Sequence, residues 1–291
     1  MTRSAITENS EDRKIASNGN PCRFSIVIPA HNEEACIART CESIIDEFAW
    51  RAVTDFEILV VNDNSSDNTE QILIDLCARY ECMRYCNNPP PHGFGFTVRR
   101  GLEQFRGDAA CIVMADLSDS PNDIYTYYTC MAAGAECVFG SRFISGSKII
   151  DYPKFKLIIN RLANWFVARL FRLSYNDVTN AFKCYRRDVI DGLQPIVSNH
   201  FNLTVELPLK AIVRGYKFKV VPISWTNRVD GVSKLKLKEM GSRYMFIVLY
   251  VLLERLLTKA DYHRSSRTVT PNLLVDADEP AISTEAIRPH R

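Results

Sequence analysis

Residues 111–121 read Cys-Ile-Val-Met-Ala-Asp-Leu-Ser-Asp-Ser-Pro, and the rest of the chain is best understood outward from this stretch. The apolar residues 111–115 predict a short buried strand, and Pro121 marks its end. Asp116 and Asp119 follow this strand directly. In an open α/β sheet, ligands bind just outside the carboxyl ends of the strands, where carboxylates can hold Mg²⁺ or Mn²⁺. Ordinary turn chemistry is the alternative, because Asp, Ser and Pro are common turn residues.

The composition is that of a globular protein with little net charge. The chain has 291 residues, of which 46% are hydrophobic and 24% charged, and this suits one large domain. A net charge of +2 does not favour nucleic acid as a partner. The 10 cysteines include no CxxC pair, which favours reduced thiols in the cytoplasm. We expect no secretory signal and no membrane span, because no apolar run reaches roughly 18–20 residues.

Strands and helices alternate before the central stretch. Strands are expected at residues 24–29, 56–61 and 83–86, and helices at about 31–50, 70–78 and 96–105. This alternation predicts βαβ units and a parallel sheet. Right-handed crossovers would bring the loops at 29–33, 62–66 and 116–119 to one edge of that sheet. A nucleotide with a divalent cation would fit such an edge.

The second half of the chain is less regular. Further strands are expected at 135–140 and 217–223, and a basic, apolar helix at 155–172. An amphipathic helix is expected over 203–214, and it contains Glu206. We expect Glu206 at the solvent-exposed surface of that helix, although a position near a bound substrate stays open.

The C-terminal part combines basic and apolar residues. Residues 234–243 carry four cations, and an apolar run over 244–253 follows them. This run is too short to span a bilayer. A helix over 241–264 would lie in a membrane interface or form a core or dimer contact, and both alternatives stay open. The polar, aperiodic ends at 1–21 and 265–291 are predicted to be disordered tails.

Five short blocks, in order, resemble those of family 2 glycosyltransferases. They are SIVIPAHNEE at 25–34, VVNDNSSDNT at 60–69, ADLSD at 115–119, GSRF at 140–143 and RVDGVSK at 228–234. Within that family the chain most resembles polyprenol-phosphate glycosyltransferases of the dolichol-phosphate mannose synthase type. The resemblance covers roughly residues 22–240. It implies a GT-A domain, an α/β fold with a mixed, mostly parallel sheet flanked by helices, followed by the C-terminal amphipathic helix.

The resemblance implies which residues bind the nucleotide-sugar donor. The nucleotide would be lined by Pro29, His31, Glu33, Asn62 and Asp63. His31 stands where the family usually has tyrosine, and Asn62 where it usually has aspartate.

The resemblance also implies a site for Mg²⁺ or Mn²⁺. Asp116 would be the metal-side carboxylate, with Ser118 and Asp119 as further candidates. The first acid of the family's usual Asp-x-Asp pair is Met114 in this chain. A thioether is a poor ligand for either cation, so the metal site departs from the family pattern at this position.

The resemblance further implies a site for an acceptor phosphate. Arg142, Arg228 and Lys234 fall where the family grips phosphate, and with Asp116 they form the expected catalytic set. Lys156 and Asn160 fall where the family usually has arginine and serine. Any one of these cations, taken alone, is compatible with an ordinary solvated surface residue.

The implied reaction is an inverting transfer of mannose or glucose from a nucleotide sugar, GDP-mannose or UDP-glucose, to a polyprenyl or dolichyl phosphate. A lipid monophosphate is already anionic near neutral pH, so it needs positioning and charge neutralisation rather than a strong base. A polyprenol lies in a membrane, so we expect a peripheral enzyme on the cytosolic face, and a homo-oligomer is compatible with this. Two alternatives stay open: a saccharide acceptor, and a non-catalytic protein that binds a nucleotide sugar or a lipid phosphate.

Overall fold

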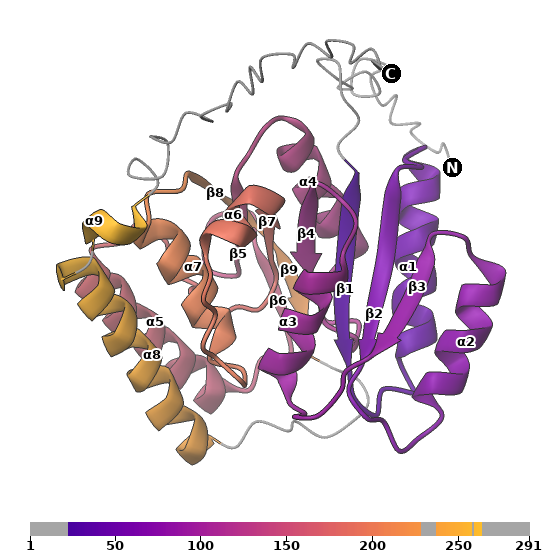
Figure 1. Cartoon of the computed structure of the whole chain (residues 1–291), viewed down its shortest axis with the longest axis horizontal. Coiled ribbons are helices and arrows are strands. Elements are labelled where there is room, and N and C mark those ends of the chain that lie inside the picture. Colours follow the sequence, from indigo (N-terminus) through magenta and orange to yellow (C-terminus); the bar gives the residue numbers. More distant parts are fainter. Residues whose placement is uncertain (1–22, 228–236, 258, 264–291) are drawn as a thin grey trace, which may run out of the picture.

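A seven-stranded sheet forms the centre of the molecule (Figure 1). The computed structural model describes residues 23–227, 237–257 and 259–263, and the tails expected at 1–21 and 265–291 lie outside this part of the chain. The strand order is β3-β2-β1-β4-β7-β5-β8. These strands are β1 Phe24–Ala30, β2 Phe56–Asn62, β3 Met83–Asn87, β4 Ala109–Ile112, β5 Cys137–Ser141, β7 Lys183–Arg186 and β8 Phe218–Pro222. Only β7 runs antiparallel to its neighbours in this sheet, which confirms the mixed, mostly parallel architecture.

Helices cover both faces of the sheet. They are α1 Ile37–Trp50, α2 Thr69–Arg79, α3 Phe94–Gln104, α4 Pro121–Ala132, α5 Lys154–Phe171, α6 Arg187–Gly192, α7 Leu203–Val213, α8 Leu237–Leu257 and α9 Lys259–Tyr262. Along β1, Val27 belongs to the core that includes α3, α5, α7 and α8. Ile26 and Ile28 belong to the core that includes α1, α2 and α4. Successive side chains of a strand point to opposite faces, so one buried strand supplies both cores.

Two short strands form a separate parallel pair. β6 Lys148–Ile150 pairs with β9 Ser224–Thr226. An isolated bridge joins Asp119 to Trp225, so this pair lies next to the loop that follows β4. β9 thus contacts the segment that contains Asp116 and Asp119.

The first helix begins later than its sequence predicted. α1 starts at Ile37 rather than near His31. Asn32 has a positive φ of 53°, which an α-helix does not allow, and Glu34 bonds through its N–H and its carboxylate to residues of the β2–α2 loop. Tertiary hydrogen bonds thus hold the acidic residues of this segment outside the helix.

The prediction that α7 is amphipathic, with Glu206 at its surface, was wrong. Residues 203–211 of this helix are all buried. Glu206 has no exposed surface, and its carboxylate lies 2.7 Å from the Nζ of Lys210, one turn later. The reason is the position of α8, which packs along α7 and covers the side that the sequence pattern assigned to solvent.

The predicted C-terminal helix is present as α8. Ile247, Val248 and Val251 are buried in the core, while Met245 and Leu249 are exposed. Within the described ranges, no helix has the length and apolar character needed to cross a membrane. Figure 1 shows α5, α7 and α8 gathered at the end of the sheet opposite α2.

Candidate active site

The loops that follow β1 and β2 are joined to each other by hydrogen bonds. The N–H of Asn32 donates to Ser65 Oγ (3.0 Å), and the N–H of Ser66 donates to Asn32 Oδ1 (2.7 Å). The N–H of Glu33 donates to Thr69 Oγ1 (2.9 Å) at the start of α2. These side chains satisfy main-chain groups that neither strand nor helix pairs. The two loops therefore form one continuous edge.

Asp63 lies at the centre of this edge. Its carboxylate accepts hydrogen bonds from Asn88 Nδ2 (2.8 Å) and the Gly93 N–H (2.8 Å), and lies 3.1 Å from His92 Nδ1. Gly93 has φ +138°, a conformation that favours glycine. The carboxylate assigned to the nucleotide by resemblance thus also holds the loop between β3 and α3.

The other residues expected to line the nucleotide lie at the same edge. His31 Nδ1 is 2.7 Å from the main-chain oxygen of Asp63. Asn62 Nδ2 donates to Asn87 Oδ1 (2.8 Å) at the end of β3. Pro29 is buried near the end of β1. The topology therefore brings together the predicted donor-side residues Pro29, His31, Glu33, Asn62 and Asp63.

The loop after β4 leaves the sheet at this edge too, because β4 pairs in parallel with β1. Leu117 has φ 59°, and the N–H of Ser118 donates to Asp116 Oδ1 (3.2 Å), which turns the chain sharply. Ala115 O accepts a hydrogen bond from Thr40 Oγ1 of α1 (2.8 Å). The expected convergence of the three loops is confirmed.

Asp116 and Asp119 differ in their surroundings. Asp119 Oδ2 accepts a hydrogen bond from the Met114 N–H (3.0 Å). Burial raises the pKa of the Asp119 carboxyl to about 7, opposed by that N–H and reinforced by the charge of Asp116. A carboxyl binds a metal ion only after it has lost its proton, so metal binding by Asp119 would be coupled to release of a proton. Among the described residues, no group of three or more His, Cys, Asp or Glu side chains could hold a metal ion.

Arg142 lies behind this loop in a buried ion pair. Its Nε and Nη2 donate to the two carboxylate oxygens of Asp177 (2.8 and 2.7 Å). Its guanidinium also lies over the rings of Phe143, Tyr152 and Trp225, 5.3 to 5.9 Å from their centroids. In the described part of the chain, Nη1 of Arg142 makes no hydrogen bond. The Asp177 pair thus orients the guanidinium along one edge and leaves Nη1 outside that pair.

The other predicted acceptor-side residues differ in their contacts and exposure, and two of them lie outside the described residues. Asn160 Nδ2 donates to Thr179 Oγ1 (2.9 Å), so α5 contacts the loop that carries Asp177. Lys156 is exposed one turn earlier on α5. Arg228 and Lys234 lie outside the described residues.

Some residues of this region were missed by the sequence analysis. Asn88 follows β3 directly, so the strand-end rule that selected the loops after β1, β2 and β4 would also have found it. Asp177 had no such signal, because it is neither at the end of a parallel strand nor in a recognised motif. Its role becomes visible only through its contact with Arg142, which is 35 residues away in the sequence.

Lys183, also missed, is a fully buried cation on β7. Its Nζ donates to the main-chain oxygens of Val178 (3.0 Å), Thr204 (3.2 Å) and Asn180. Burial lowers the pKa of Lys183 to about 7, although Asp177 opposes this shift. The lysine therefore bonds to the same loop that carries Asp177, the partner of Arg142.

This pKa predicts how stability depends on pH. Between about pH 7 and pH 10.5 the unfolded chain binds the lysine proton and the folded chain does not, so the free energy of unfolding rises with pH. The slope is at most about 1.4 kcal/mol per pH unit. Relative to Lys183→Met, the wild type should gain stability between pH 7 and pH 9 in urea unfolding. A difference between the two proteins that does not change with pH would contradict the lowered pKa.

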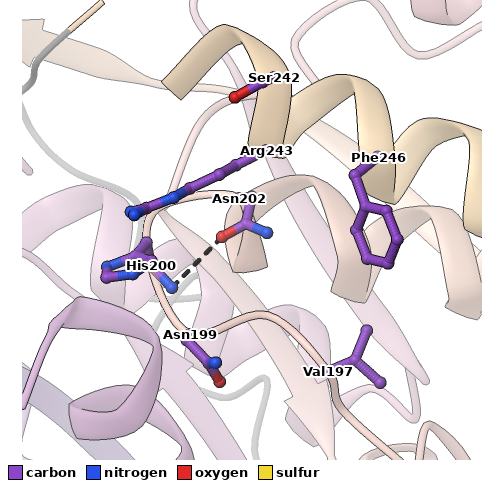
Figure 2. Close-up of a pocket in the computed structure, with 7 residues that line it drawn as sticks. All are labelled: Val197, Asn199, His200, Asn202, Ser242, Arg243 and Phe246. Atoms are coloured by element: carbon purple, nitrogen blue, oxygen red, sulfur yellow. Dashed lines mark hydrogen bonds between the residues drawn. The ribbon is translucent and has the colours of Figure 1, made fainter. Parts of the chain in front are cut away.

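A pocket of about 480 Å³ lies beside the start of α3, between the loop that precedes α7 and the first described turns of α8. Figure 2 shows Val197 and Phe246 at its apolar end and His200 and Arg243 at its polar end. The His200 N–H donates to Asn202 Oδ1 (3.2 Å), which shapes the loop wall. The walls of the pocket thus come from the segment at 197–202 and from α8.

Comparison with solved structures identifies the fold. Glucosyl-3-phosphoglycerate synthase from Mycobacterium tuberculosis, in complex with UDP, matches with a TM-score of 0.60 at 19% identity. The match covers 87% of this chain and 86% of that one. At this identity the likeness concerns the fold, which is that of GT-A glycosyltransferases.

Sequence relatives extend the comparison. Polyprenol monophosphomannose synthase of Mycolicibacterium smegmatis is 27% identical over 219 residues, which are 73% of this chain and 81% of that protein. Dolichol-phosphate mannosyltransferase of Pyrococcus furiosus is 27% identical over 221 residues, 74% of this chain but 59% of that protein. The chain therefore spans less than two thirds of the Pyrococcus relative.

The family is decided by a match to a family model. The model of glycosyl transferase family 2 matches residues 25–193, which is more than half of the 291-residue chain and contains the β1, β2 and β4 loops. The chain belongs to glycosyl transferase family 2.

Proposed function

We propose that this glycosyltransferase moves a hexose from a nucleotide sugar to a polyprenyl phosphate, with inversion at the anomeric carbon. The observation that carries the proposal is that the loops after β1, β2 and β4 and the residue Arg142 after β5 lie at the same edge of the sheet. A donor side is built around Asp63 and Asp116, and an oriented guanidinium, Arg142, lies beside it. Support for the acceptor class comes from the relatives, which are named for polyprenol and dolichol phosphate.

On the donor side, the loops after β1 and β2 would hold the nucleotide. His31, Glu33 and Asp63 bring a ring, a carboxylate and main-chain groups to one edge. Such groups can read the base and the ribose by hydrogen bonds. Pro29 and Asn62 would shape the floor of this site. Which base is bound stays open between guanine and uracil.

Mg²⁺ or Mn²⁺ would enter with the donor diphosphate. Asp116 would be its main protein ligand, with Ser118 beside it, while Asp119 is engaged by the Met114 N–H. This small donor set fits Mg²⁺, which is often bound by one or two carboxylates together with substrate phosphates and water. When bound, the cation would stabilise the negative charge that builds up on the departing diphosphate.

On the acceptor side, Arg142 would bind the lipid phosphate through Nη1, while Asp177 holds the other two nitrogens. Lys156, Asn160, Arg228 and Lys234 are the further candidates. A phosphate oxygen attacks the anomeric carbon, and the bond from this carbon to the diphosphate breaks. Because attack and departure occur on opposite faces, an α-linked donor gives a β-linked lipid-phosphate sugar.

A membrane surface is the proposed place of this reaction, on its cytosolic side. α5 carries four cations and no acid, and α8 runs beside it, joined by the Arg255 Nη1 bond to Phe171 O (2.8 Å) (Figure 1). Both helices expose apolar side chains: Phe155, Ile158, Leu162, Trp165, Phe166, Met245, Phe246, Leu249, Leu253, Leu256 and Leu257. Cationic helices with an exposed apolar stripe bind anionic bilayers in the plane of the interface.

Leu162→Glu should therefore weaken binding to vesicles of anionic phospholipid by at least about tenfold, because one leucine side chain contributes roughly 1.5–3 kcal/mol when buried. Flotation with the vesicles measures this. Ile74→Glu, on α2 at the other end of the molecule, is the matched control and should float like the wild type. Equal loss in both variants would contradict this docking surface.

The test of the function is a transfer assay with a short polyprenyl phosphate, Mg²⁺ or Mn²⁺, and GDP-mannose or UDP-glucose offered separately. Formation of a lipid-phosphate sugar from either donor is the expected result and names the sugar. Transfer to a saccharide but not to the lipid phosphate would favour the alternative acceptor. Nucleotide binding without transfer to any acceptor would favour a binding protein.

A further inference from the structure

Three buried charged residues follow one another at intervals of one helical turn along α7 and its C-cap residue. They are Glu206, Lys210 and Arg214, and each is no more than 1% exposed. Glu206 pairs with Lys210 (2.7 Å), and Arg214 pairs with Glu254 of α8 (2.7 Å). None of the four belongs to the donor or acceptor residues proposed above. Their burial therefore needs an explanation other than substrate contact.

Glu206 holds the main chain of the loop that precedes α7. Its two carboxylate oxygens accept the N–H groups of Val197 (2.9 Å) and Ser198 (2.7 Å). Lys210, its partner, donates to the main-chain oxygen of Pro195. Three consecutive bonds thus fix residues 195–198. The main-chain N–H groups of Val197 and Ser198 thus find their acceptor in a buried side chain rather than in another main-chain group.

This loop in turn supports the start of α3. Asn199 O, the next residue, accepts a hydrogen bond from the Gly95 N–H (3.1 Å). The contact is so close that a Cβ on Gly95 would lie 2.4 Å from the Asn199 carbonyl carbon. The rings of Phe94 and Phe201 stack at 4.2 Å across the same junction. The first turn of α3 therefore takes its position from the loop.

The start of α3 is also joined to the donor side. The Gly93 N–H donates to Asp63 Oδ2 (2.8 Å), two residues before Gly95. A continuous path of contacts therefore runs from Glu206 through Ser198 and Asn199 to the glycines, and ends at the carboxylate of Asp63. Val197 and Asn199 of the same loop also line the pocket shown in Figure 2.

Stability alone does not account for this arrangement. A buried ion pair can often be replaced by apolar side chains of similar volume with no loss of stability. What apolar side chains cannot provide is a directional acceptor for two adjacent N–H groups. Glu206 and Glu254 differ in their hydrogen-bond donors. The Glu206 carboxylate accepts hydrogen bonds from main-chain N–H groups of the loop, whereas the Glu254 carboxylate accepts them from the Arg214 side chain.

We propose that Glu206 is a positioning residue for the donor nucleotide: it holds the loop at 195–199 so that the start of α3 keeps Asp63 in its binding orientation. The inference rests on the proposed function in one respect: it assumes that the nucleotide binds at the sheet edge that contains Asp63. It makes no use of the acceptor.

The experiment compares Glu206→Gln with Glu254→Gln. Both substitutions keep side-chain size and remove one buried negative charge from an ion pair on the same pair of helices. Glutamine at 206 retains one acceptor oxygen, so one of the two loop N–H groups loses its partner. We measure urea unfolding, the Kd of GDP and of UDP by calorimetry without lipid, and the steady-state constants for transfer.

Both variants should lose stability, but only Glu206→Gln should weaken nucleotide binding. We expect its nucleoside diphosphate Kd and its KM for the donor to rise about tenfold, with kcat changed less than about threefold, as for lost ground-state binding. Glu254→Gln should keep both values within about twofold of the wild type. Equal changes in the two variants would overturn the inference, as would an unchanged Kd in Glu206→Gln.

A double variant separates positioning from folding. In Glu206→Gln the ammonium of Lys210 is left buried without its carboxylate, so Glu206→Gln with Lys210→Met should recover stability. The raised Kd should persist, because one of the two loop N–H groups still lacks its acceptor and the bond from Lys210 to the Pro195 main-chain oxygen is lost as well. Recovery of Kd together with stability would show a merely structural role and overturn the inference.

These measurements also distinguish this inference from the proposed function. If the wild type binds GDP or UDP but transfers no sugar to polyprenyl phosphate, the acceptor assignment fails and the Kd comparison still decides the role of Glu206. If the wild type binds neither nucleotide, the inference fails as well.

Discussion

Asp116→Asn is expected to lower kcat for sugar transfer by about 10²–10³, which is the usual loss when one preorganised group that stabilises developing charge is removed. Asp116 lies in the tight turn after β4, where the Ser118 N–H donates to it, and it is almost fully buried. An asparagine would preserve this turn because its side-chain oxygen can accept the same bond. It would lose the negative charge that attracts a cation.

The measurement is the transfer assay combined with titration of Mn²⁺ into the protein with a nucleoside diphosphate. In the wild type we expect Mn²⁺ to tighten nucleotide binding, and in Asp116→Asn we expect this effect to disappear. Asp123→Asn is the matched control, because Asp123 is a nearby buried acid that accepts the Ser224 N–H (2.6 Å). It should keep kcat within about fivefold. A full kcat in Asp116→Asn would remove this residue from the catalytic set.

Asp177→Asn is expected to destabilise the protein by about 3 kcal/mol or more, because it leaves the buried guanidinium of Arg142 without its counter-charge. Asp177 is completely buried and accepts three hydrogen bonds from Arg142, two from the side chain and one from the main chain. Asparagine can accept through one oxygen only. Its amide N–H₂ would face the Arg142 donors on the other side.

The same change should weaken use of the acceptor more than use of the donor. A guanidinium that is no longer held by Asp177 can rotate away from a bound phosphate, so KM for the lipid phosphate should rise while KM for the nucleotide sugar stays close to that of the wild type. Unfolding in urea and initial rates with each substrate varied give both quantities.

Asp188→Asn provides the control for the stability effect. Asp188 pairs with Arg186 in a similar two-point geometry, but its side chain is 54% exposed. Exposed ion pairs contribute at most about 1 kcal/mol. Comparable destabilisation in the two variants would mean that burial is not what makes the Asp177 pair important.

The strand-end loops were predictable from the sequence because their signal is local. Short β-branched runs followed at once by polar residues identified β1 and β2, and the run before Asp116 identified β4. Parallel strand order then required the loops to share an edge, whatever the details of packing. The same local logic explains why the start of α1 was misplaced. Capping-type residues at 31–34 bond to a loop more than 30 positions away instead of starting the helix.

Buried charges were not predictable in this way. Glu206 fits the polar face of an amphipathic helix, and only the packing of α8 turns that face inward. Arg142 was recognised by its motif, but its partner Asp177 was not, since no spacing rule links two residues on different elements.

By itself, the sequence determined the alternation of strands and helices up to β4, the polar loops at the strand ends and the family, because each depends on neighbouring residues and on motifs in order. The tertiary structure decided which charges are paired and buried, and which loop supports which. Asp63, Arg142 and Glu206 take their partners from segments 8 to 35 positions away. Such contacts depend on how the helices and loops pack against the sheet. Local sequence patterns do not predict that packing.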